Sequence, residues 1–259
     1  MKQNTDYVSS LAKGLAVISH LASVKSPQTL TEVADALEMP KATARRLLLT
    51  LESLGYAEQA SRYFSLTPQT LQLGFGYFAS SPLSSHIDTQ LQRISSDTGH
   101  TSFAAVYSKG EITIIGRHVG LILESYSSLG TRWPAFCTSM GRIFLSYLPD
   151  DEVDRILREG RMTKFTSSTL TDIEKIKAEI RKVRKSGYAL IESETTMGLR
   201  ALAVPVEGKN QEIVAAIDVV MIAQSESRKE SVDKNLPVLQ EAASRLSVIA
   251  ANSTSPSPI

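Results

Sequence analysis

The sequence has few of the residues on which several classes of protein depend. Its 259 residues include one cysteine, Cys137, and one tryptophan. A single cysteine excludes an internal disulfide framework and a structural zinc site built from several thiolates. No pair of histidines or carboxylates has the spacing of metal ligands with a matching third group. We therefore predict no metal and no other cofactor.

Long apolar runs and an excess of one charge are also lacking. No stretch approaches the ~18 apolar residues of a membrane-spanning helix. The first ten residues, MKQNTDYVSS, are polar where a signal peptide would be apolar. We therefore expect a cytoplasmic protein without a membrane partner. The 28 basic and 27 acidic residues give a net charge of +1, so the total charge does not indicate nucleic acid binding.

The length and the local charge pattern are more informative. Single cores stop growing near ~250–300 residues, so 259 residues favour two domains. Between Pro40 and Leu51 there are three cations, Lys41, Arg45 and Arg46, and no acid. Most runs of surface charge are only solvated, so the organisation of this segment must decide its role.

The N-terminal segment has the pattern of three short helices. Apolar residues at helical spacing predict an amphipathic helix over residues 10–22. Thr29 precedes Glu32 by three residues, the spacing of a capping box, and predicts the start of a second helix of about nine residues. Pro40 suits the first turn of a third helix, which Gly55 ends.

The third helix has the features of a DNA-recognition helix. A short helix, a tight connection and a second helix with cations at its N-terminal end are typical of a helix-turn-helix. Strand-like runs at 56–58 and 63–66 predict a hairpin wing with Arg62 near its tip. The alternative is a three-helix packing module with a hairpin, but the combined features favour DNA binding. The predicted DNA-contacting residues are Lys41, Ala42, Thr43, Arg45, Arg46 and Arg62.

The C-terminal part alternates predicted strands and helices. Strands are predicted at 102–107, 112–117, 121–126, 188–193, 199–206 and 213–220. Helices are predicted at 84–98, 139–148, 150–159, 171–186 and 229–251. Antiparallel strands with helices beside them form an α+β arrangement.

A series of short motifs runs along the chain from about Tyr7 to Ala250. The N-terminal ones are KGL at 13–15, LTEVA at 30–34, PKATARRLL at 40–48 and GY at 55–56. The C-terminal ones are GTRWP at 130–134, TSMGRIFL at 138–145, GY at 187–188, GLRALAVPV at 198–206 and VAAI at 214–217. In this order they resemble the IclR family of bacterial transcriptional regulators. The segments EITIIGRH at 111–118 and SLGTRWPA at 128–135 resemble the subgroup controlling protocatechuate, 4-hydroxybenzoate and β-ketoadipate catabolism.

The resemblance implies a particular domain organisation. It implies a winged helix-turn-helix over 1–67, a linker helix over 68–82 and a GAF-like α/β effector-binding domain over 83–252. Residues 253–259, with the sequence STSPSPI, follow a predicted helix. They are predicted to form a disordered tail. In the family the linker contributes to dimerisation. Its apolar and aromatic residues suit a helix with a partner or, equally, a helix that fills an intramolecular groove.

A small-molecule site is expected near Thr138. Residues 130–134 are predicted to be a loop, and a helix follows. The backbone N–H groups of Ser139, Met140 and Gly141 would then be free to bind an anion. Alternatively Thr138 caps this helix and no ligand is needed.

The resemblance adds further effector-binding positions. It implies roles for Ile122, Glu192, Ala201, Asp218 and Val220, while Trp133, Phe136 and Met140 would line a slot for a flat aromatic acid. Relatives have a cysteine or serines at Ala201, Asp218 and Val220, and an acid at Ile191, so this pocket is expected to be more apolar. Asp218 would repel an anion unless it is protonated or turned away.

Two other classes of function fit the sequence less well. A hydrolase would use Cys137 with a histidine base, but none of the four histidines lies in a motif with it, and we predict no enzyme. A sensor acting only through protein partners would not need the cations at 41–46. We therefore expect a homodimer or dimer of dimers that binds a pseudo-palindromic promoter site. A small organic acid would shift the orientation of its DNA-binding domains.

Overall fold

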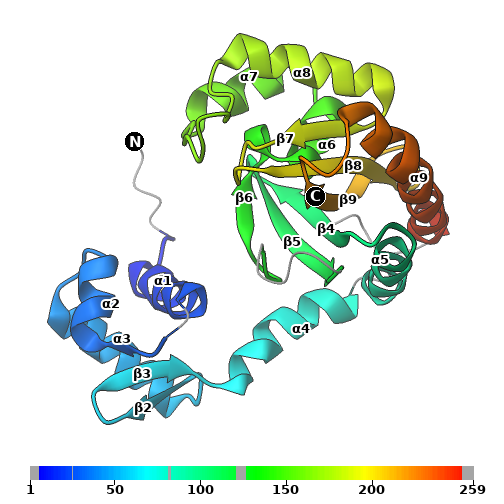
Figure 1. Ribbon diagram of the computed structural model, residues 1–259. Coiled ribbons are helices and arrows are strands. Elements are labelled where there is room, and N and C mark those ends of the chain that lie inside the picture. The colour runs from blue at the N-terminus through cyan, green and yellow to red at the C-terminus, as the bar shows by residue number, and fades with distance from the viewer. Residues whose placement is uncertain (1–5, 25, 81–82, 121–126, 253–259) are drawn as a thin grey trace. The chain divides into compact units, whose positions relative to one another are not determined.

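The structure, a computed structural model, describes residues 6–24, 26–80, 83–120 and 127–252 (Figure 1). The chain divides into two compact units, Met1–Phe78 and Ala79–Ile259. The predicted strand at 121–126, with Ile122, and the predicted tail at 253–259 lie outside the described residues.

The first unit contains three helices and a three-stranded antiparallel sheet. The helices are α1 (Ser9–Ser23), α2 (Leu30–Ala36) and α3 (Lys41–Ser53). The strands are β1 (Gln28–Thr29), β2 (Ala57–Ala60) and β3 (Tyr63–Leu66), in the order β1-β3-β2. The predicted helices and wing are therefore confirmed, and β1 adds a strand to the wing. The core consists of Val17, Leu21, Val33, Leu48, Leu51, Ala57 and Phe64.

Local signals in the sequence set the bounds of these helices. The Thr29 hydroxyl accepts from the Glu32 N–H, and the Glu32 carboxylate accepts from the Thr29 N–H at 2.7 Å, so the predicted capping box is present. Gly55 follows α3 with a φ of +81°, a left-handed conformation that favours glycine. The polypeptide therefore turns sharply from α3 into the wing.

A helix also forms where the linker was predicted. The 3₁₀ turn η1 (Pro68–Thr70) leads into α4 (Leu71–Ser80). Leu71, Leu73 and Phe75 are exposed on this helix. An apolar helix surface left open to water is unfavourable in an isolated chain.

The second unit is built on one six-stranded antiparallel sheet in the order β6-β5-β4-β9-β8-β7. Its strands are β4 (Thr101–Ser108), β5 (Glu111–His118), β6 (Arg132–Pro134), β7 (Ala189–Glu192), β8 (Leu199–Glu207) and β9 (Ile213–Ile222). Its helices are α5 (Ser84–Thr98), α6 (Ser139–Tyr147), α7 (Asp150–Glu159), α8 (Ile173–Ser186) and α9 (Arg228–Asn252), with the 3₁₀ turn η2 (Ala135–Cys137) before α6. The α+β fold class is confirmed.

Helices cover both faces of this sheet (Figure 1). Helices α5 and α9 pack on one face, against residues such as Leu202, Ile217 and Val219. Helix α6 packs on the other, against Phe103 and Ala203. Helix α8 packs on α6, and α7 packs on α8. Because successive side chains of β8 and β9 point to opposite faces, these strands contribute to a core on each face of the sheet. Helix α6 is enclosed between the sheet and the outer helices.

One predicted loop is wrong in part. Residues Arg132–Pro134 form β6, which pairs with Glu111–Thr113 of β5. Three residues are too few to show strand alternation in a sequence, and the pairing depends on β5.

Within the described ranges no helix is long and apolar enough to span a lipid bilayer.

Candidate DNA interface and effector cavity

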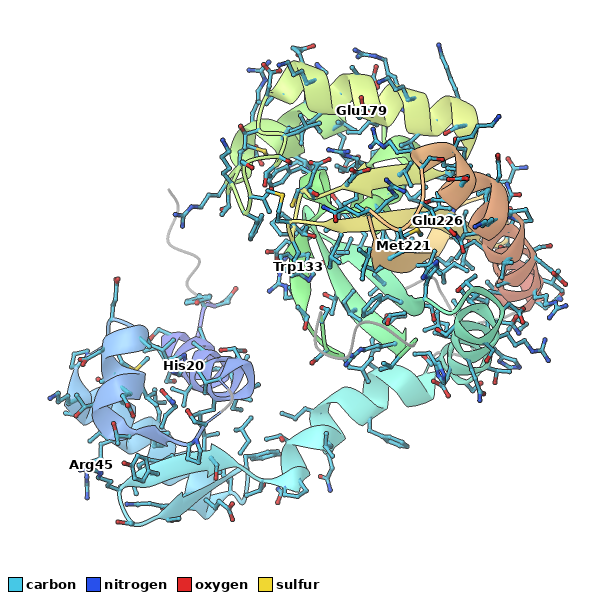
Figure 2. All side chains as sticks on the ribbon, viewed as in Figure 1. His20, Arg45, Trp133, Glu179, Met221 and Glu226 are labelled. Carbon is cyan, nitrogen blue, oxygen red and sulfur yellow. The ribbon has the colours of Figure 1, made fainter. Side chains whose placement is uncertain are left out.

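Helix α3 presents its cations on its solvent side. Its buried face consists of Ala44, Leu48 and Leu51. Lys41, Ala42, Arg45 and Arg46 are exposed and Thr43 is half-buried. Figure 2 shows the Arg45 side chain extending outward from the helix. Within the described part of the chain, no ion pair or side-chain hydrogen bond engages the charged groups of Lys41, Arg45 or Arg46.

The wing carries a further cation at its tip. Arg62 follows Ser61 in the two-residue turn between the paired residues Ala60 and Tyr63. Its guanidinium donates a hydrogen bond to the Tyr63 hydroxyl at 3.0 Å and lies 5.2 Å from the centre of that ring. Arg62 is thus held in place while remaining exposed.

Six of the residues expected around an effector line a small cavity beneath the start of α6. Trp133, Thr138, Ser139, Met140, Ala201 and Asp218 all line it. Ile191, expected as an apolar position of the pocket, also lines it, together with four residues that were not predicted: Phe103, Ile112, Ile114 and Ser127. The cavity volume is about 20 Å³, which is room for a water molecule and not for an aromatic ring.

Asp218 is the charged group of this cavity. It lies on β9 between Phe103 of β4 and Ala203 of β8 and is 3% exposed. The Ser139 hydroxyl donates to Asp218 Oδ2 at 2.7 Å, whereas Oδ1 is buried without a partner among the described residues. Burial raises the pKa of Asp218 to about 7, opposed by the Ser139 hydrogen bond.

The start of α6 is partly capped by the protein itself. The Thr138 hydroxyl accepts from the Gly141 N–H at 3.1 Å, so the expectation of a free N–H at Gly141 is wrong. The N–H groups of Ser139 and Met140 lie in the first turn of α6, where backbone N–H groups have no partner within the helix itself. A Cβ on Gly141 would lie 2.2 Å from the Ala135 backbone oxygen, so only glycine lets the start of α6 pack this closely on Ala135. Two donors of the helix end therefore remain available for an anion.

Two expected effector residues lie elsewhere. Glu192 does not line the cavity, because strand alternation turns Ile191 toward it and Glu192 away. Glu192 forms ion pairs with Arg200 at 2.9 Å and Arg228 at 3.4 Å. Val220 shares the buried face of the cavity residues without lining it.

Two family models match this chain, one for each unit. The model of the IclR helix-turn-helix domain matches residues 10–61, and that of the bacterial transcriptional regulator IclR C-terminal domain matches residues 75–248. The chain belongs to the IclR family. It is therefore a DNA-binding transcriptional regulator under effector control.

Individual IclR-family relatives span nearly the whole chain. The Pca regulon regulatory protein of Pseudomonas putida is 36% identical over 90% of this chain and 81% of its own. The crystal structure of an IclR transcriptional regulator from Alicyclobacillus acidocaldarius is 27% identical with a TM-score of 0.84, covering 95% and 100% of the two chains. The PobR inducer-binding domain from Acinetobacter, solved as a double mutant with 3-hydroxybenzoic acid, is 26% identical with a TM-score of 0.57, covering 61% and 94%.

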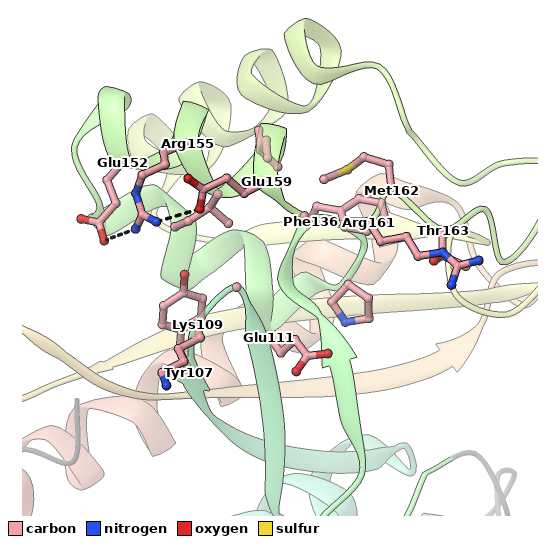
Figure 3. Close-up of a pocket in the computed structure, with 15 residues that line it drawn as sticks. Tyr107, Lys109, Glu111, Phe136, Glu152, Arg155, Glu159, Arg161, Met162 and Thr163 are labelled. Atoms are coloured by element: carbon pink, nitrogen blue, oxygen red, sulfur yellow. Dashed lines mark hydrogen bonds and ion pairs between the residues drawn. The ribbon is translucent and has the colours of Figure 1, made fainter. Parts of the chain in front are cut away.

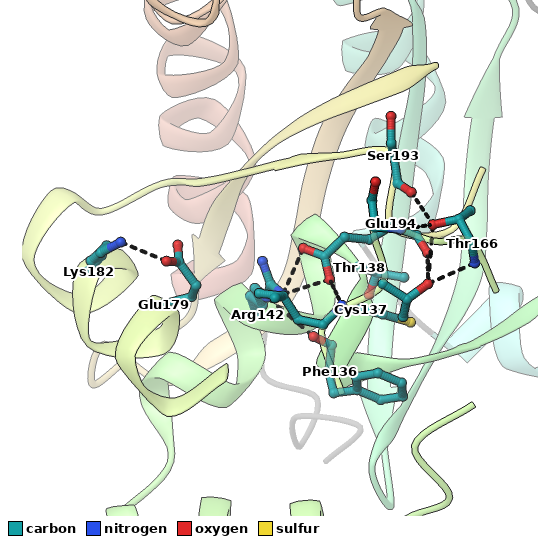
Figure 4. A network of polar contacts seen from close by, with 12 residues as sticks. Phe136, Cys137, Thr138, Arg142, Thr166, Glu179, Lys182, Ser193 and Glu194 are labelled. Carbon is teal, nitrogen blue, oxygen red and sulfur yellow. Dashed lines mark hydrogen bonds and ion pairs between the residues drawn. The ribbon is translucent and has the colours of Figure 1, made fainter. Parts of the chain in front are cut away.

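In this IclR-family chain a buried polar network braces the start of α6 (Figure 4). Arg142 and Glu194, 3% and 6% exposed, form an ion pair at 2.8 Å. Arg142 also donates to the Phe136 carbonyl, and Glu194 accepts from the Leu170 N–H. The Thr169 hydroxyl donates to the Glu194 carbonyl at 2.7 Å. The network ties α6 to the segment that follows β7.

Cys137 lies inside the core of this IclR-family domain. It is fully buried, and burial raises the pKa of its thiol to about 12. A thiol with that pKa carries almost no thiolate at neutral pH, which is the form a nucleophile needs. Its surroundings fit a small apolar residue.

A larger cavity of about 700 Å³ lies beside the β4–β5 turn and α7 (Figure 3). Phe136 lines this cavity rather than the one at Asp218, which corrects the expectation for that residue. Its rim includes Arg155, paired with Glu152 at 3.8 Å and Glu159 at 3.0 Å. The two glutamates thus already compensate much of the charge of Arg155.

Proposed function

We propose that this regulator binds DNA as a homodimer with α3 in the major groove. Lys41, Ala42, Thr43, Arg45 and Arg46 would contact phosphates and base edges, and Arg62 would contact the backbone beside the wing. The observation that carries the proposal is the absence of described protein partners for the three α3 cations. Unpaired cations gathered on a recognition helix are suited to phosphate oxygens.

The proposed target is a pseudo-palindromic promoter site. A two-fold dimer presents two copies of α3, and these fit half-sites separated by about one helical turn, ~34–36 Å. Ala42 offers a methyl group that suits contact with a thymine methyl.

We further propose that the effector is a small aromatic acid bound at the Asp218 cavity. Three features support this: the apolar and aromatic walls, the first-turn N–H groups of α6, and the hydroxybenzoic acid held by the related PobR domain. The proposed binding residues are Trp133, Thr138, Ser139, Met140, Ala201 and Asp218, with Gly141 and Val220 supporting them.

The cavity must enlarge to accept an aromatic ring, because it has room for only a water molecule. Trp133 is best placed to move, since it lies on the short strand β6 and is only half-buried. It packs edge-on against Phe165 with ring centres 5.4 Å apart. Effector binding would thus displace β6 and favour one of two arrangements of the dimer.

The DNA interface is tested by Arg45→Ala/Arg46→Ala in a gel-shift titration against a fragment carrying the promoter beside the protein's own gene. Removing four cations from a dimer should lower the slope of log affinity against log salt by about 3 to 4, at ~0.9 for each phosphate contact. Affinity at low salt should fall by at least tenfold.

A matched control removes the same charge from the second unit. Lys182 and Lys185 are exposed on α8, so Lys182→Ala/Lys185→Ala should leave affinity and salt slope unchanged. Equal effects of the two double variants would show that only total charge matters. An unchanged salt slope in the α3 variant would remove α3 from the interface.

A further inference from the structure

Asp218 is unusual for a site that is proposed to bind an acid. Among the described lining residues it is the one ionisable group, and the others are apolar, aromatic or hydroxyl-bearing. None of the described lining residues is an arginine or lysine that could offset a charge on it. A buried carboxylate without a cation is unfavourable, and a second carboxylate beside it would be more so.

The two oxygens of Asp218 have different surroundings. Oδ2 accepts from the Ser139 hydroxyl at 2.7 Å, and Oδ1 has no partner within the described ranges. The free Oδ1 belongs to a side chain that lines the cavity, so an incoming ligand can satisfy it. Ser139 and Met140, the first two residues of α6, also line this cavity, so it lies at the positive end of the helix.

These features together define what a ligand must carry. The start of α6 supplies two N–H donors for an anion. Asp218, however, repels an anion unless the Asp218 carboxyl group is protonated. We propose that the effector binds as a carboxylate only while Asp218 is protonated, so that binding takes up one proton wherever Asp218 is ionised in the free protein. The Asp218 hydroxyl at Oδ1 donates to one carboxylate oxygen of the effector, and the N–H groups of α6 donate to the other. This inference rests on the proposed effector site.

Other charged groups on the elements around Asp218 do not replace it as the proton acceptor. On β4, the pKa of Tyr107 is raised by burial, and on η2 the Cys137 thiol is neutral. One turn along α6, Arg142 is paired with Glu194. The facing residues of β5, β7 and β8 that line the cavity are Ile112, Ile114, Ile191 and Ala201.

The sign of the pH dependence follows from these charges. Burial places the pKa of Asp218 near 7 in the free protein, and a bound carboxylate raises it further. Above about pH 7 the free protein must therefore take up a proton to bind. Affinity then falls by up to about tenfold for each pH unit, while below about pH 6 it is constant. A ligand that instead donates a hydroxyl to an ionised Asp218 would bind more tightly as pH rises.

The test is calorimetric titration of the full chain between pH 6 and pH 8.5. The probe is 4-hydroxybenzoate, with 4-hydroxybenzamide as the uncharged comparison. The carboxylate should lose about tenfold in affinity between pH 7.5 and pH 8.5, and the amide should not. At pH 8, titrations in buffers of different ionisation enthalpy should report uptake of about one proton for the carboxylate.

Variants locate the proton. Asp218→Asn keeps a donor at the same position without an ionisable group, so its affinity for 4-hydroxybenzoate should not change with pH. Asp88 is exposed on α5, and Asp88→Asn should keep the wild-type pH dependence. If Asp218→Asn does not fold, proton uptake by the wild type still decides the matter.

Failure of this inference is distinct from failure of the proposed effector class. Binding of 4-hydroxybenzoate with an affinity that is constant or rises from pH 6 to pH 8.5 would overturn the proton uptake alone. The same pH slope in Asp218→Asn as in wild type would also overturn it. Absence of binding by both probes at every pH would overturn the aromatic-acid site and this inference with it.

Discussion

The buried pair Arg142–Glu194 is the residue-scale contact on which the effector domain depends most directly. Both side chains are at most 6% exposed, and the pair joins α6 to a segment 52 residues further along the chain. Arg142→Met leaves Glu194 buried and uncompensated. We expect the free energy of unfolding to fall by about 3–5 kcal/mol, the usual cost of breaking a buried pair. Urea denaturation monitored by circular dichroism measures it.

The pH dependence of that loss identifies its cause. Burial raises the pKa of Glu194, and Arg142 opposes this. Without Arg142 the folded protein favours protonated Glu194 more strongly, so the loss should be larger at pH 8 than at pH 5. Arg142→Met/Glu194→Gln should recover part of it. The exposed pair Arg245–Glu241 provides a control, and a loss in Arg245→Met as large as in Arg142→Met would contradict the argument.

Single residues also show where sequence reasoning stops. The resemblance implies an effector role for the segment that begins at Glu192, the last residue of β7. The structure turns Ile191 inward instead. Successive strand residues face opposite sides, so a shift of one residue exchanges them, and only the pairing of β7 with β8 sets that register. The Arg142–Glu194 contact was not predicted either, because no local pattern links residues so far apart.

At the scale of elements, the start of α6 depends on its cap. The Thr138 hydroxyl accepts from the Gly141 N–H and donates to the Pro134 carbonyl at 3.4 Å. Thr138→Ala removes the cap, and we expect a loss of about 1 kcal/mol in the free energy of unfolding. Thr138→Ser keeps the hydroxyl and should lose less than half as much. Guanidinium denaturation of the three proteins checks the order, and equal losses for Ala and Ser would show that the methyl group matters instead.

Most elements could be predicted because their signals are local. The capping box of α2, the proline before α3 and the apolar spacing of α3 each lie within one or two helical turns. Strands β1 and β6 were missed because they contain two and three residues and form only against β3 and β5. Most elements of the site were therefore predictable, whereas β6, which carries Trp133, and the contacts that close the cavity depend on tertiary pairing.

At the scale of the whole molecule, a net charge of +1 limits how DNA can be bound. A protein without a general positive field gains little from long-range attraction to DNA. Affinity must then come from a few placed contacts, and the proposed homodimer would double their number. The exposed apolar residues of the first unit would supply a surface for this proposed dimer.

The apolar surface of the first unit includes three exposed leucines. Leu11 and Leu15 on α1 and Leu73 on α4 are 63%, 52% and 55% exposed, and they line a groove of about 750 Å³ between α1, α3 and α4. Thr43 and Arg46, which are proposed to contact DNA, also line this groove, so a second copy would have to bury Leu11, Leu15 and Leu73 while leaving those two residues accessible. Leu15→Glu/Leu73→Glu should weaken the dimer at least about 30-fold, equivalent to ~2 kcal/mol, as for central interface residues.

Sedimentation equilibrium measures the dimer, and gel shift measures DNA binding at a protein concentration where the variant is monomeric. The variant should lose both, because each half-site alone offers half of the contacts. Val248 on α9 is 60% exposed, and Val248→Glu should change neither. A dimer that persists in Leu15→Glu/Leu73→Glu would place the joining surface elsewhere. A monomer that still binds the full site with wild-type affinity would show that α3 does not act in pairs.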